Sequence, residues 1–257
     1  MNASPTLSLP PLRILSEKNQ HDLVVTHLRR RARSGPIHIL EAGCGRQWYY
    51  DLQGAQYKLT GVDLDGEALE VRKRQEGDLD EVIVGDLRDV PLPANEYDVI
   101  YTSYVLEHID GARTVLDNFL RWSKPDGLVI IYIPDCQSAY GFFSRYTPHW
   151  LHVWFYRFVL GRRDAGKAGN APYPTYYDEV VSRAGIREYA SDNGLDLCEE
   201  CGYYRPPGLT RLFMNAAHAL SFGKLAASHC DLLFILERRV APGLVPVRVE
   251  SSALTER

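Results

Sequence analysis

The sequence predicts an α/β fold, in which a mostly parallel sheet is covered by helices on both faces and roofed by aromatic-rich insertions. Short apolar runs alternate with helical stretches through the first two-thirds of the chain, the pattern of a parallel sheet with helical crossovers. Three of these runs end in an acidic residue. The 257 residues, 45% of them hydrophobic, are enough to bury a full core.

Seven segments are expected to be strands, because each is a short apolar run bounded by helix or turn signals. In chain order they span 37–42, 58–63, 81–85, 97–102, 128–133, 195–202 and 231–237.

Three further segments are predicted to be helices. Residues 66–75 and 111–123 place apolar side chains three and four positions apart. The Lys-Pro-Asp-Gly sequence at 124–127 should close the second helix with a turn. A third helix should run from the N-cap Ser182 up to Gly194, which can take the left-handed backbone that ends helices.

The chain is expected to divide into an N-terminal helical segment (1–35), a main domain (36–240) and a C-terminal tail (241–257). Within the main domain, residues 136–175 are rich in aromatic side chains and show no continuous period. That segment and a helix-rich one at about 204–228 are predicted to be insertions.

The formal net charge of -4 gives no overall positive field, so a nucleic-acid acceptor is not expected. Four arginines between residues 29 and 33 form a local exception. We interpret them as the solvated end of a helix, and a contact with phosphate or lipid headgroups is the alternative, which leaves a peripheral membrane contact open. We expect a cytoplasmic location, because no segment resembles a targeting or membrane-spanning sequence.

The five cysteines are an odd number scattered along the chain, which favours free thiols over a disulfide framework. Cys198 and Cys201 have the spacing of half a zinc site. Because no second pair accompanies them, we predict no metal site.

The strongest chemical signal is the end of the first predicted strand, Glu41-Ala-Gly-Cys-Gly45. Glycine is needed where backbone turns sharply and approaches a ligand closely. A nucleotide site further requires an acidic residue at the end of the next strand, about 20 residues on. Asp63 meets that requirement and Asp86 ends the third strand, so three carboxylates should meet at one sheet edge. No third glycine follows Gly45, which disfavours a dinucleotide.

In order and spacing, the motifs resemble those of class I S-adenosylmethionine-dependent methyltransferases. The resemblance covers about residues 37–134. It implies a Rossmann-like sheet of seven strands whose last strand is antiparallel, with S-adenosyl-L-methionine as cofactor and S-adenosyl-L-homocysteine as product. The segments that carry it are Glu41-Ala-Gly-Cys-Gly45, Gly61-Val-Asp63, Gly85-Asp86-Leu87, residues 97–109 and Lys124-Pro-Asp-Gly127.

The resemblance also implies cofactor-binding roles. The Ser103 backbone would hold the methionine ammonium, and a loop would wrap the methionine end of the cofactor. That loop consists of Glu41, Ala42, Gly43, Cys44 and Gly45.

At the adenosine end, Asp63 would accept hydrogen bonds from both ribose hydroxyls and Leu64 would lie against the adenine. Asp86 would accept from the adenine amino group, with the backbone of Leu87 beside it.

Three histidines are candidates for a catalytic base, which methyl transfer needs when the acceptor is a poorly ionised hydroxyl. His108 follows the fourth predicted strand, and a supporting role there is the alternative. His149 and His152 fall at helical spacing with Tyr156. Their polar stripe either lines the acceptor pocket or belongs to an ordinary core helix.

Aromatic walls in the first insertion would suit sugar rings or hydrophobic chains. Residues 140–143, 147–157 and 174–177 resemble a subgroup of these methyltransferases associated with bacterial glycan and polysaccharide assembly. We therefore expect O-methylation of a sugar, glycolipid or other small-molecule hydroxyl by in-line displacement. The alternatives are a lipid or natural-product acceptor at a membrane surface and a cofactor-binding protein without catalysis. The sequence predicts no oligomeric state.

Overall fold

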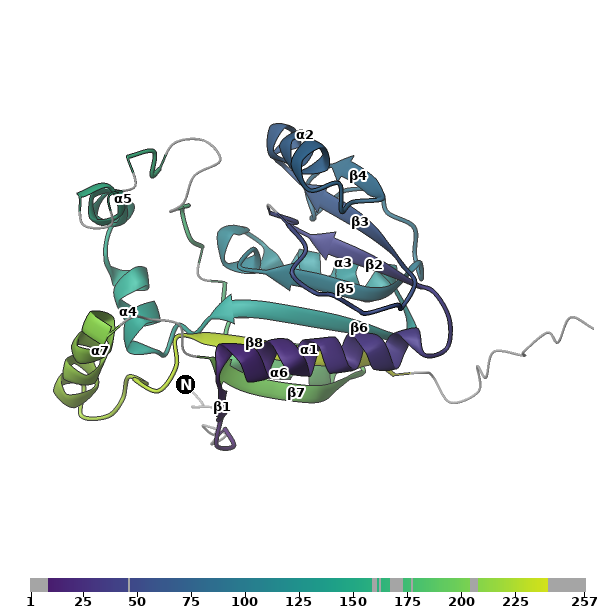
Figure 1. Cartoon of the computed structure of the whole chain (residues 1–257). Helices are drawn as coiled ribbons and strands as arrows, with labels where there is room; N and C mark the ends of the chain where they lie inside the picture. The colour runs from purple at the N-terminus through teal and green to yellow at the C-terminus, as the bar shows by residue number, and fades with distance from the viewer. Residues whose placement is uncertain are drawn as a thin grey trace, which may run out of the picture.

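A computed structural model describes residues 9–239, except 46, 159–160, 162, 167–172, 177 and 204–207. Its centre is one eight-stranded sheet with helices on both faces (Figure 1). The strands are β1 (Arg13–Leu15), β2 (Ile37–Ala42), β3 (Tyr57–Asp63), β4 (Glu81–Val84), β5 (Tyr97–Ser103), β6 (Ser123–Pro134), β7 (Leu195–Tyr203) and β8 (Asp231–Arg238).

The helices lie between these strands in the alternation that the sequence predicts. They are α1 (Glu17–Ala32), α2 (Gly66–Gln75), the short 3-10 helix η1 (Leu106–His108), α3 (Ala112–Trp122), α4 (Ala139–Tyr146), α5 (His149–Phe158), α6 (Arg183–Asp192) and α7 (Gly208–Leu220).

The strand order across the sheet is β1-β7-β8-β6-β5-β2-β3-β4. Strand β8 runs antiparallel to both of its neighbours, and the other pairings are parallel. Chain order therefore reverses direction between β2 and β5. Parallel sheets open a crevice for ligands at the carboxyl ends of the strands flanking such a switch point.

All seven predicted strands are present, and the antiparallel last strand is confirmed. The structure adds an eighth strand, β1, inside the segment that the sequence analysis assigned to helix. Arg13 pairs with Cys201 and Leu15 with Tyr203 at the outer edge of the sheet. Three residues are too few to show a period of two, so no pattern could have revealed this strand. The terminal tail at 241–257 lies outside the described residues.

The prediction that residues 124–127 close the second helix with a turn is wrong, because these residues form a bulge within β6. Helix α3 ends at Trp122 and Ser123 already belongs to β6. Across the sheet, Tyr97 pairs with Ser123 but Val99 pairs with Leu128, so the intervening residues bulge out of the ladder. Residue Asp126 turns the bulge with a left-handed backbone, φ 62°.

Two hydrophobic layers cover the sheet. Trp122 and Phe119 of α3, with Tyr189 of α6, are fully buried on one face, whereas Val24 and Leu28 of α1 are fully buried on the other. Among the four arginines at positions 29–33, Arg31 pairs with Asp98 at 3.1 Å and Arg29 donates to the Asp51 carbonyl at 3.4 Å. This part of the run therefore contacts the protein itself.

The two predicted insertions meet beyond the carboxyl ends of β6 and β7 (Figure 1). Helices α4 and α7 share a small apolar cluster that includes Ala139, Met214 and Ala217. The Ala139 amide donates to the Ala226 carbonyl at 2.7 Å, and Ser138 forms a parallel bridge with Ala226. The insertions thus form one unit, to which α5 is attached through α4.

Candidate active site

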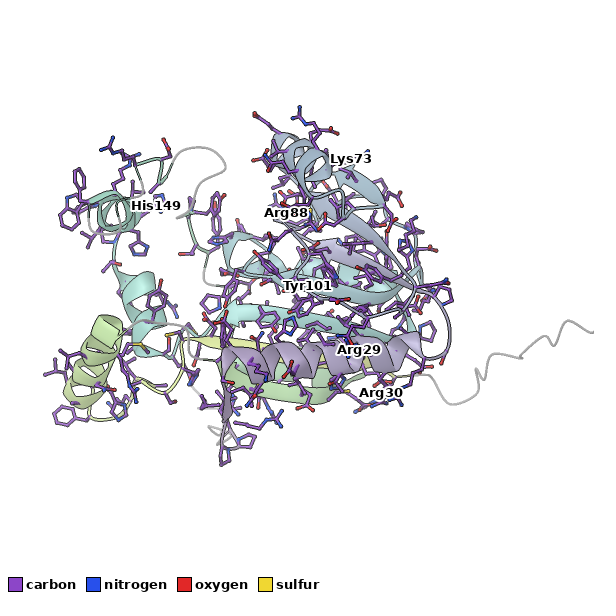
Figure 2. The ribbon with its side chains drawn as sticks, viewed as in Figure 1. Arg29, Arg30, Lys73, Arg88, Tyr101 and His149 are labelled. Carbon is purple, nitrogen blue, oxygen red and sulfur yellow. The ribbon has the colours of Figure 1, made fainter. Side chains whose placement is uncertain are left out.

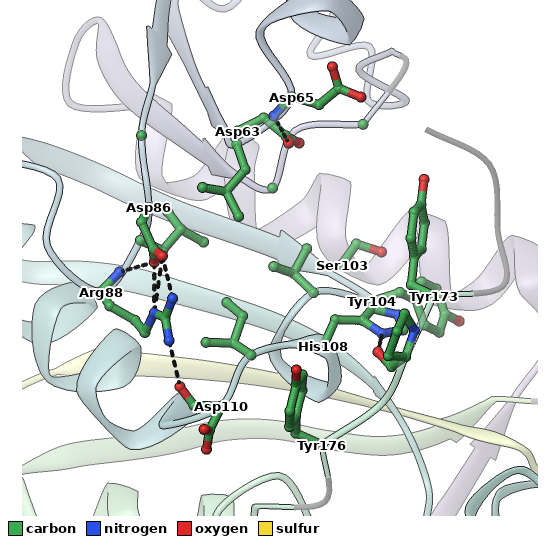
Figure 3. A pocket seen from close by; sticks show the side chains of 18 residues that line it. Asp63, Asp65, Asp86, Arg88, Ser103, Tyr104, His108, Asp110, Tyr173 and Tyr176 are labelled. Atoms are coloured by element: carbon green, nitrogen blue, oxygen red, sulfur yellow. Dashed lines mark hydrogen bonds and ion pairs between the residues drawn. The ribbon is translucent and has the colours of Figure 1, made fainter. Parts of the chain in front are cut away.

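A cavity of about 580 Å³ opens at the carboxyl ends of the central strands, beside the switch point (Figure 3). Its walls come from four strand ends, from η1 and from the end of the first insertion. The lining residues are Gly43, Gly45, Asp63, Leu64, Asp65, Gly85, Asp86, Leu87, Arg88, Ser103, Tyr104, Val105, His108, Ile109, Asp110, Tyr173, Pro174 and Tyr176.

Glycines shape the floor of the cavity. Gly43 and Gly45 both have left-handed backbones, with φ of 72° and 54°. A Cβ on Gly43 would collide with the side chain of Val105, whereas a Cβ on Gly45 would meet only open space. Glycine is therefore required at 43 both by the backbone and by packing, and at 45 by the backbone alone.

Two carboxylates face the cavity from neighbouring strand ends. Asp63 accepts the Asp65 amide through Oδ1 at 3.0 Å. Asp86 is gripped by Arg88, whose Nη2 lies 2.6 Å from Oδ2 and whose Nε lies 3.0 Å from Oδ1 (Figure 3). The Arg88 hydrogen bonds hold the pKa of Asp86 below its usual range. Both acids therefore present hydrogen-bond acceptors to a ligand.

Behind the glycine loop, a buried guanidinium ties three segments together. Arg72 of α2 contacts Glu41 Oε2 at 2.8 Å and both carboxylate oxygens of Asp78 at 3.0 and 2.9 Å. It also donates to the Cys44 carbonyl, and Asp78 accepts the Trp48 amide at 2.7 Å. The loop is thus held from its buried side, away from the cavity.

His108 is oriented by the first insertion. Its Nδ1 lies 2.7 Å from the Pro174 carbonyl oxygen, which can only accept a hydrogen bond, so Nδ1 carries the proton and Nε2 keeps a lone pair. Burial lowers the pKa of His108 below the ordinary histidine value. The Tyr173 ring lies edge-on, with its centroid 5.6 Å from the imidazole (Figure 3). At neutral pH this histidine is an uncharged hydrogen-bond acceptor on the cavity wall.

A second hydrogen bond joins the insertion to η1. The Tyr176 amide donates to the Glu107 carbonyl at 2.7 Å. The Glu107 side chain is 4% exposed, and its Oε2 atom has no hydrogen-bond partner among the described residues. Burial raises the pKa of Glu107 to about 8, with a smaller contribution from Asp231. The Glu107 side chain, which lies behind the contact between η1 and the insertion, therefore favours its protonated form.

The structure brings most of the predicted site residues together. The following line the cavity: Gly43, Gly45, Asp63, Leu64, Asp86, Leu87, Ser103 and His108. Glu41, Ala42 and Cys44 are buried behind the loop and do not line it.

The other two histidines belong to α5 and do not line the cavity; Figure 2 labels His149. His149 is exposed, and His152 hydrogen-bonds the Thr147 hydroxyl. Helix α5 is not a core helix, because Trp150 and Phe158 are 67% and 73% exposed. The catalytic role of these histidines stays a prediction, and the side chain of Tyr156 lies outside the described part of the structure.

Sequence reasoning missed Arg72 as the anchor behind the loop. It also missed four cavity residues: Arg88 as the partner of Asp86, and Tyr173, Pro174 and Tyr176 as a wall. Arg72 and Arg88 are ordinary helix and loop residues in the sequence. The last three belong to the aromatic-rich part of the sequence, whose pattern does not indicate which of its residues line the cavity.

Metal binding finds no support in the described ranges, which hold no group of three or more metal-ligating side chains. All five cysteines are free thiols, as the sequence predicts. Within the described part of the chain, no helix has the length and apolarity to cross a bilayer.

Comparison with known proteins gives concordant matches. Residues 40–131 match the family model described as "Methyltransferase domain". The chain is 26% identical over 177 residues to a demethylmenaquinone methyltransferase of Symbiobacterium thermophilum, covering 59% of this chain and 68% of that protein. It is 28% identical over 131 residues to a malonyl-[acyl-carrier protein] O-methyltransferase of Halalkalibacterium halodurans, covering 45% and 46%. The chain thus spans about half the length of several curated relatives that it matches.

Among solved structures, a putative S-adenosylmethionine-dependent methyltransferase from Listeria monocytogenes superposes with a TM-score of 0.56. The match covers 87% of this chain and all of that one at 14% sequence identity, which supports the fold.

A glycine loop and strand-end carboxylates at the switch point of a Rossmann-like sheet define a nucleoside-binding α/β protein. The family match and the named relatives specify which kind. The chain is a class I S-adenosylmethionine-dependent methyltransferase, and S-adenosyl-L-methionine is its cofactor.

The cavity fits that cofactor. Its carboxylates can accept from hydroxyl and amino groups, and the open space beside Gly45 admits a ligand against the backbone. Arg88 is the one arginine among the described lining residues and is already paired with Asp86. The donor set therefore suits an adenosine without phosphate.

The buried Glu107 carboxyl predicts a pH-dependent stability. Its folded-state pKa of about 8 lies above the unfolded value near 4.3, so its stabilising contribution is complete below that unfolded value. The contribution is lost as pH rises towards and through about 8. Glu107→Gln cannot ionise, so its stability relative to wild type should rise across this window by a few kcal/mol. Thermal denaturation of both proteins at pH 5 and pH 8 measures the difference in their free energy of unfolding. An equal difference at both pH values would contradict the prediction.

Proposed function

We propose that this enzyme methylates a hydroxyl group of a small molecule, with a sugar or glycolipid as the favoured acceptor class and His108 as the base. The observation that carries the proposal is the orientation of His108. Its protonated nitrogen is engaged by the Pro174 carbonyl, which leaves the Nε2 lone pair for an acceptor proton.

The cofactor supplies a methyl group on a positively charged sulfur, which makes that methyl carbon electrophilic. In the proposed binding mode, Asp63 accepts from the ribose hydroxyls while Leu64 packs against the adenine. Asp86 accepts from the adenine amino group with the Leu87 backbone beside it. The methionine end lies along Gly43 and Gly45, near the Ser103 backbone. These residues all line the same cavity.

In the proposed reaction, the acceptor oxygen attacks the methyl carbon in line with the carbon–sulfur bond. The hydroxyl proton passes to Nε2 of His108, and the electron pair of the broken bond stays on sulfur. The depressed pKa of His108 keeps Nε2 unprotonated and ready to accept at neutral pH. Positioning of the methyl group and the acceptor hydroxyl in the same cavity supplies the remainder of the acceleration.

The wall of the cavity supports the proposed acceptor class. Tyr173, Pro174 and Tyr176 line the side next to His108, and aromatic rings stack against the C–H faces of sugars as well as against other flat groups. The two relatives named above have different acceptors in their names, demethylmenaquinone and malonyl-[acyl-carrier protein]. The family model matches only residues 40–131, so it does not extend to Tyr173–Tyr176.

Replacing Asp63 tests the cofactor-binding mode. Each charge-assisted hydrogen bond contributes on the order of 1.5 to 3 kcal/mol. Asp63→Ala should therefore weaken binding of S-adenosylhomocysteine by about 10- to 100-fold, whereas the exposed Glu70→Gln on α2 should leave it unchanged. Titration calorimetry measures both affinities, and equal binding by the Asp63 variant would overturn this mode.

Replacing His108 tests the base. His108→Asn keeps a donor for the Pro174 carbonyl but removes the proton acceptor, so turnover should fall by about 10²- to 10⁴-fold with cofactor affinity retained. The acidic limb of the wild-type pH–rate profile should lie below the ordinary histidine pKa of about 6.5. Turnover is read as mass increase across a panel of sugar, glycolipid, lipid and phenolic acceptors.

The matched variant His152→Asn separates the two histidine hypotheses. If His152→Asn and not His108→Asn abolishes turnover, the base lies on α5 and the proposal fails. Methylation of amines or thiols with no turnover of any hydroxyl acceptor would also contradict it.

A further inference from the structure

The two insertions expose apolar side chains in an ordered way. On α5, Trp150, Trp154 and Phe158 are spaced four residues apart and so lie along one face. They are 67%, 49% and 73% exposed, and the rings of Trp154 and Phe158 lie 5.9 Å apart. On α7, Leu212 and Leu220 are also exposed and share a face. The insertions therefore present apolar surface to their surroundings.

Helices α1 and α2, which cover the sheet, expose a different kind of side chain. The exposed positions of α1 and α2 carry polar or charged side chains, such as Lys18, Asp22, Glu67 and Lys73. Exposed aromatic residues are thus not a general property of this surface. The exposed aromatic residues of α5 and the exposed leucines of α7 lie at the same side of the molecule in Figure 1.

The same segments are strongly basic in sequence. Residues 136–175 and 204–228 contain eight of the chain's 29 lysines and arginines but only one of its 33 acidic residues. In a chain with a formal net charge of -4, the insertions are therefore a separate positive region. Among their described basic residues, Arg145, Arg157, Arg163, Arg211 and Lys224 are exposed.

We propose that the exposed face of α5 and α7 docks onto an anionic lipid bilayer. Tryptophan and phenylalanine favour the boundary between headgroups and acyl chains, and surrounding arginines and lysines attract anionic lipids. Trp150, Trp154 and Phe158 would enter that boundary, and the basic residues would contact the headgroups. A second copy of this chain fits less well, because facing insertions would oppose two basic surfaces.

The docking face and the catalytic cavity share one insertion. Residues Tyr173 and Pro174 of that insertion line the cavity, whereas α5 of the same insertion carries the exposed aromatic stripe. Docking would thus place the acceptor side of the enzyme towards the membrane. The arginines at positions 29 and 30 lie at the opposite side of the molecule in Figure 2 and are not part of this face.

Vesicle flotation of the full chain tests the proposal without any need for an acceptor. The protein should float with vesicles of phosphatidylcholine and phosphatidylglycerol, more weakly at high salt, and at least tenfold more weakly with phosphatidylcholine alone. The triple variant Trp150→Ser, Trp154→Ser, Phe158→Ser should lose at least tenfold in vesicle affinity. The control Tyr49→Ser, Val84→Ser alters two equally exposed residues elsewhere and should bind like wild type. Retained binding of S-adenosylhomocysteine shows that each variant is folded.

Fluorescence gives a second measurement. Of the four tryptophans, Trp122 is buried and Trp48 is half-buried, so a blue shift with anionic vesicles should come from Trp150 and Trp154. The variant Trp150→Phe, Trp154→Phe should float but lose the shift. The proposal is overturned by no flotation, by equal affinity for neutral vesicles, or by equal loss in the control. It is also overturned if sedimentation shows a dimer that the triple variant dissociates. None of these outcomes bears on the base or the acceptor hydroxyl, so docking and the proposed function fail separately.

Discussion

The Arg72 guanidinium is the interaction on which the cofactor side of this molecule depends. It is 2% exposed and contacts the end of β2 through Glu41, the glycine loop through the Cys44 carbonyl, and the loop before β4 through Asp78. A buried charge is tolerated only when it is paired, and removal of one partner of such a pair typically costs about 3 to 5 kcal/mol. These contacts fix the backbone of the loop from its buried side.

Residues of this loop that face the protein interior and residues that face the cavity have different roles. Glu41 and Cys44 face inwards and fix the backbone, whereas Gly43 and Gly45 face the cavity and leave room for a ligand. On the other wall, the Pro174 carbonyl accepts a hydrogen bond from His108 and the Tyr176 amide donates to the Glu107 carbonyl. These two bonds fasten the end of the first insertion to η1 and orient His108. In the proposed binding mode, the sheet edge positions the cofactor and the insertion forms the wall next to the acceptor.

The central sheet could be predicted from the sequence because buried strands and crossover helices leave clear apolar patterns. The helix at 66–75 and the N-cap Ser182 were located to the residue. The glycines and carboxylates at the strand ends were found because ligand geometry restricts residue type there. Strand β1 was too short to show a pattern, and the bulge at 124–127 depended on register with β5. The pairing of Arg72 with Glu41, and of His108 with the Pro174 carbonyl, depended on contacts between residues 31 and 66 positions apart, which no local pattern encodes.

The central claim is that the switch-point cavity is the site at which this methyltransferase binds its cofactor. Hydrogen–deuterium exchange of the whole chain with and without S-adenosylhomocysteine tests it directly, because bound ligand slows exchange of the backbone that it covers. We expect slower exchange at 41–45, 63–65, 85–88 and 103–110, with α5 and α7 unchanged. Absence of slowing at the first two segments, or slowing confined to the insertions, would contradict the account.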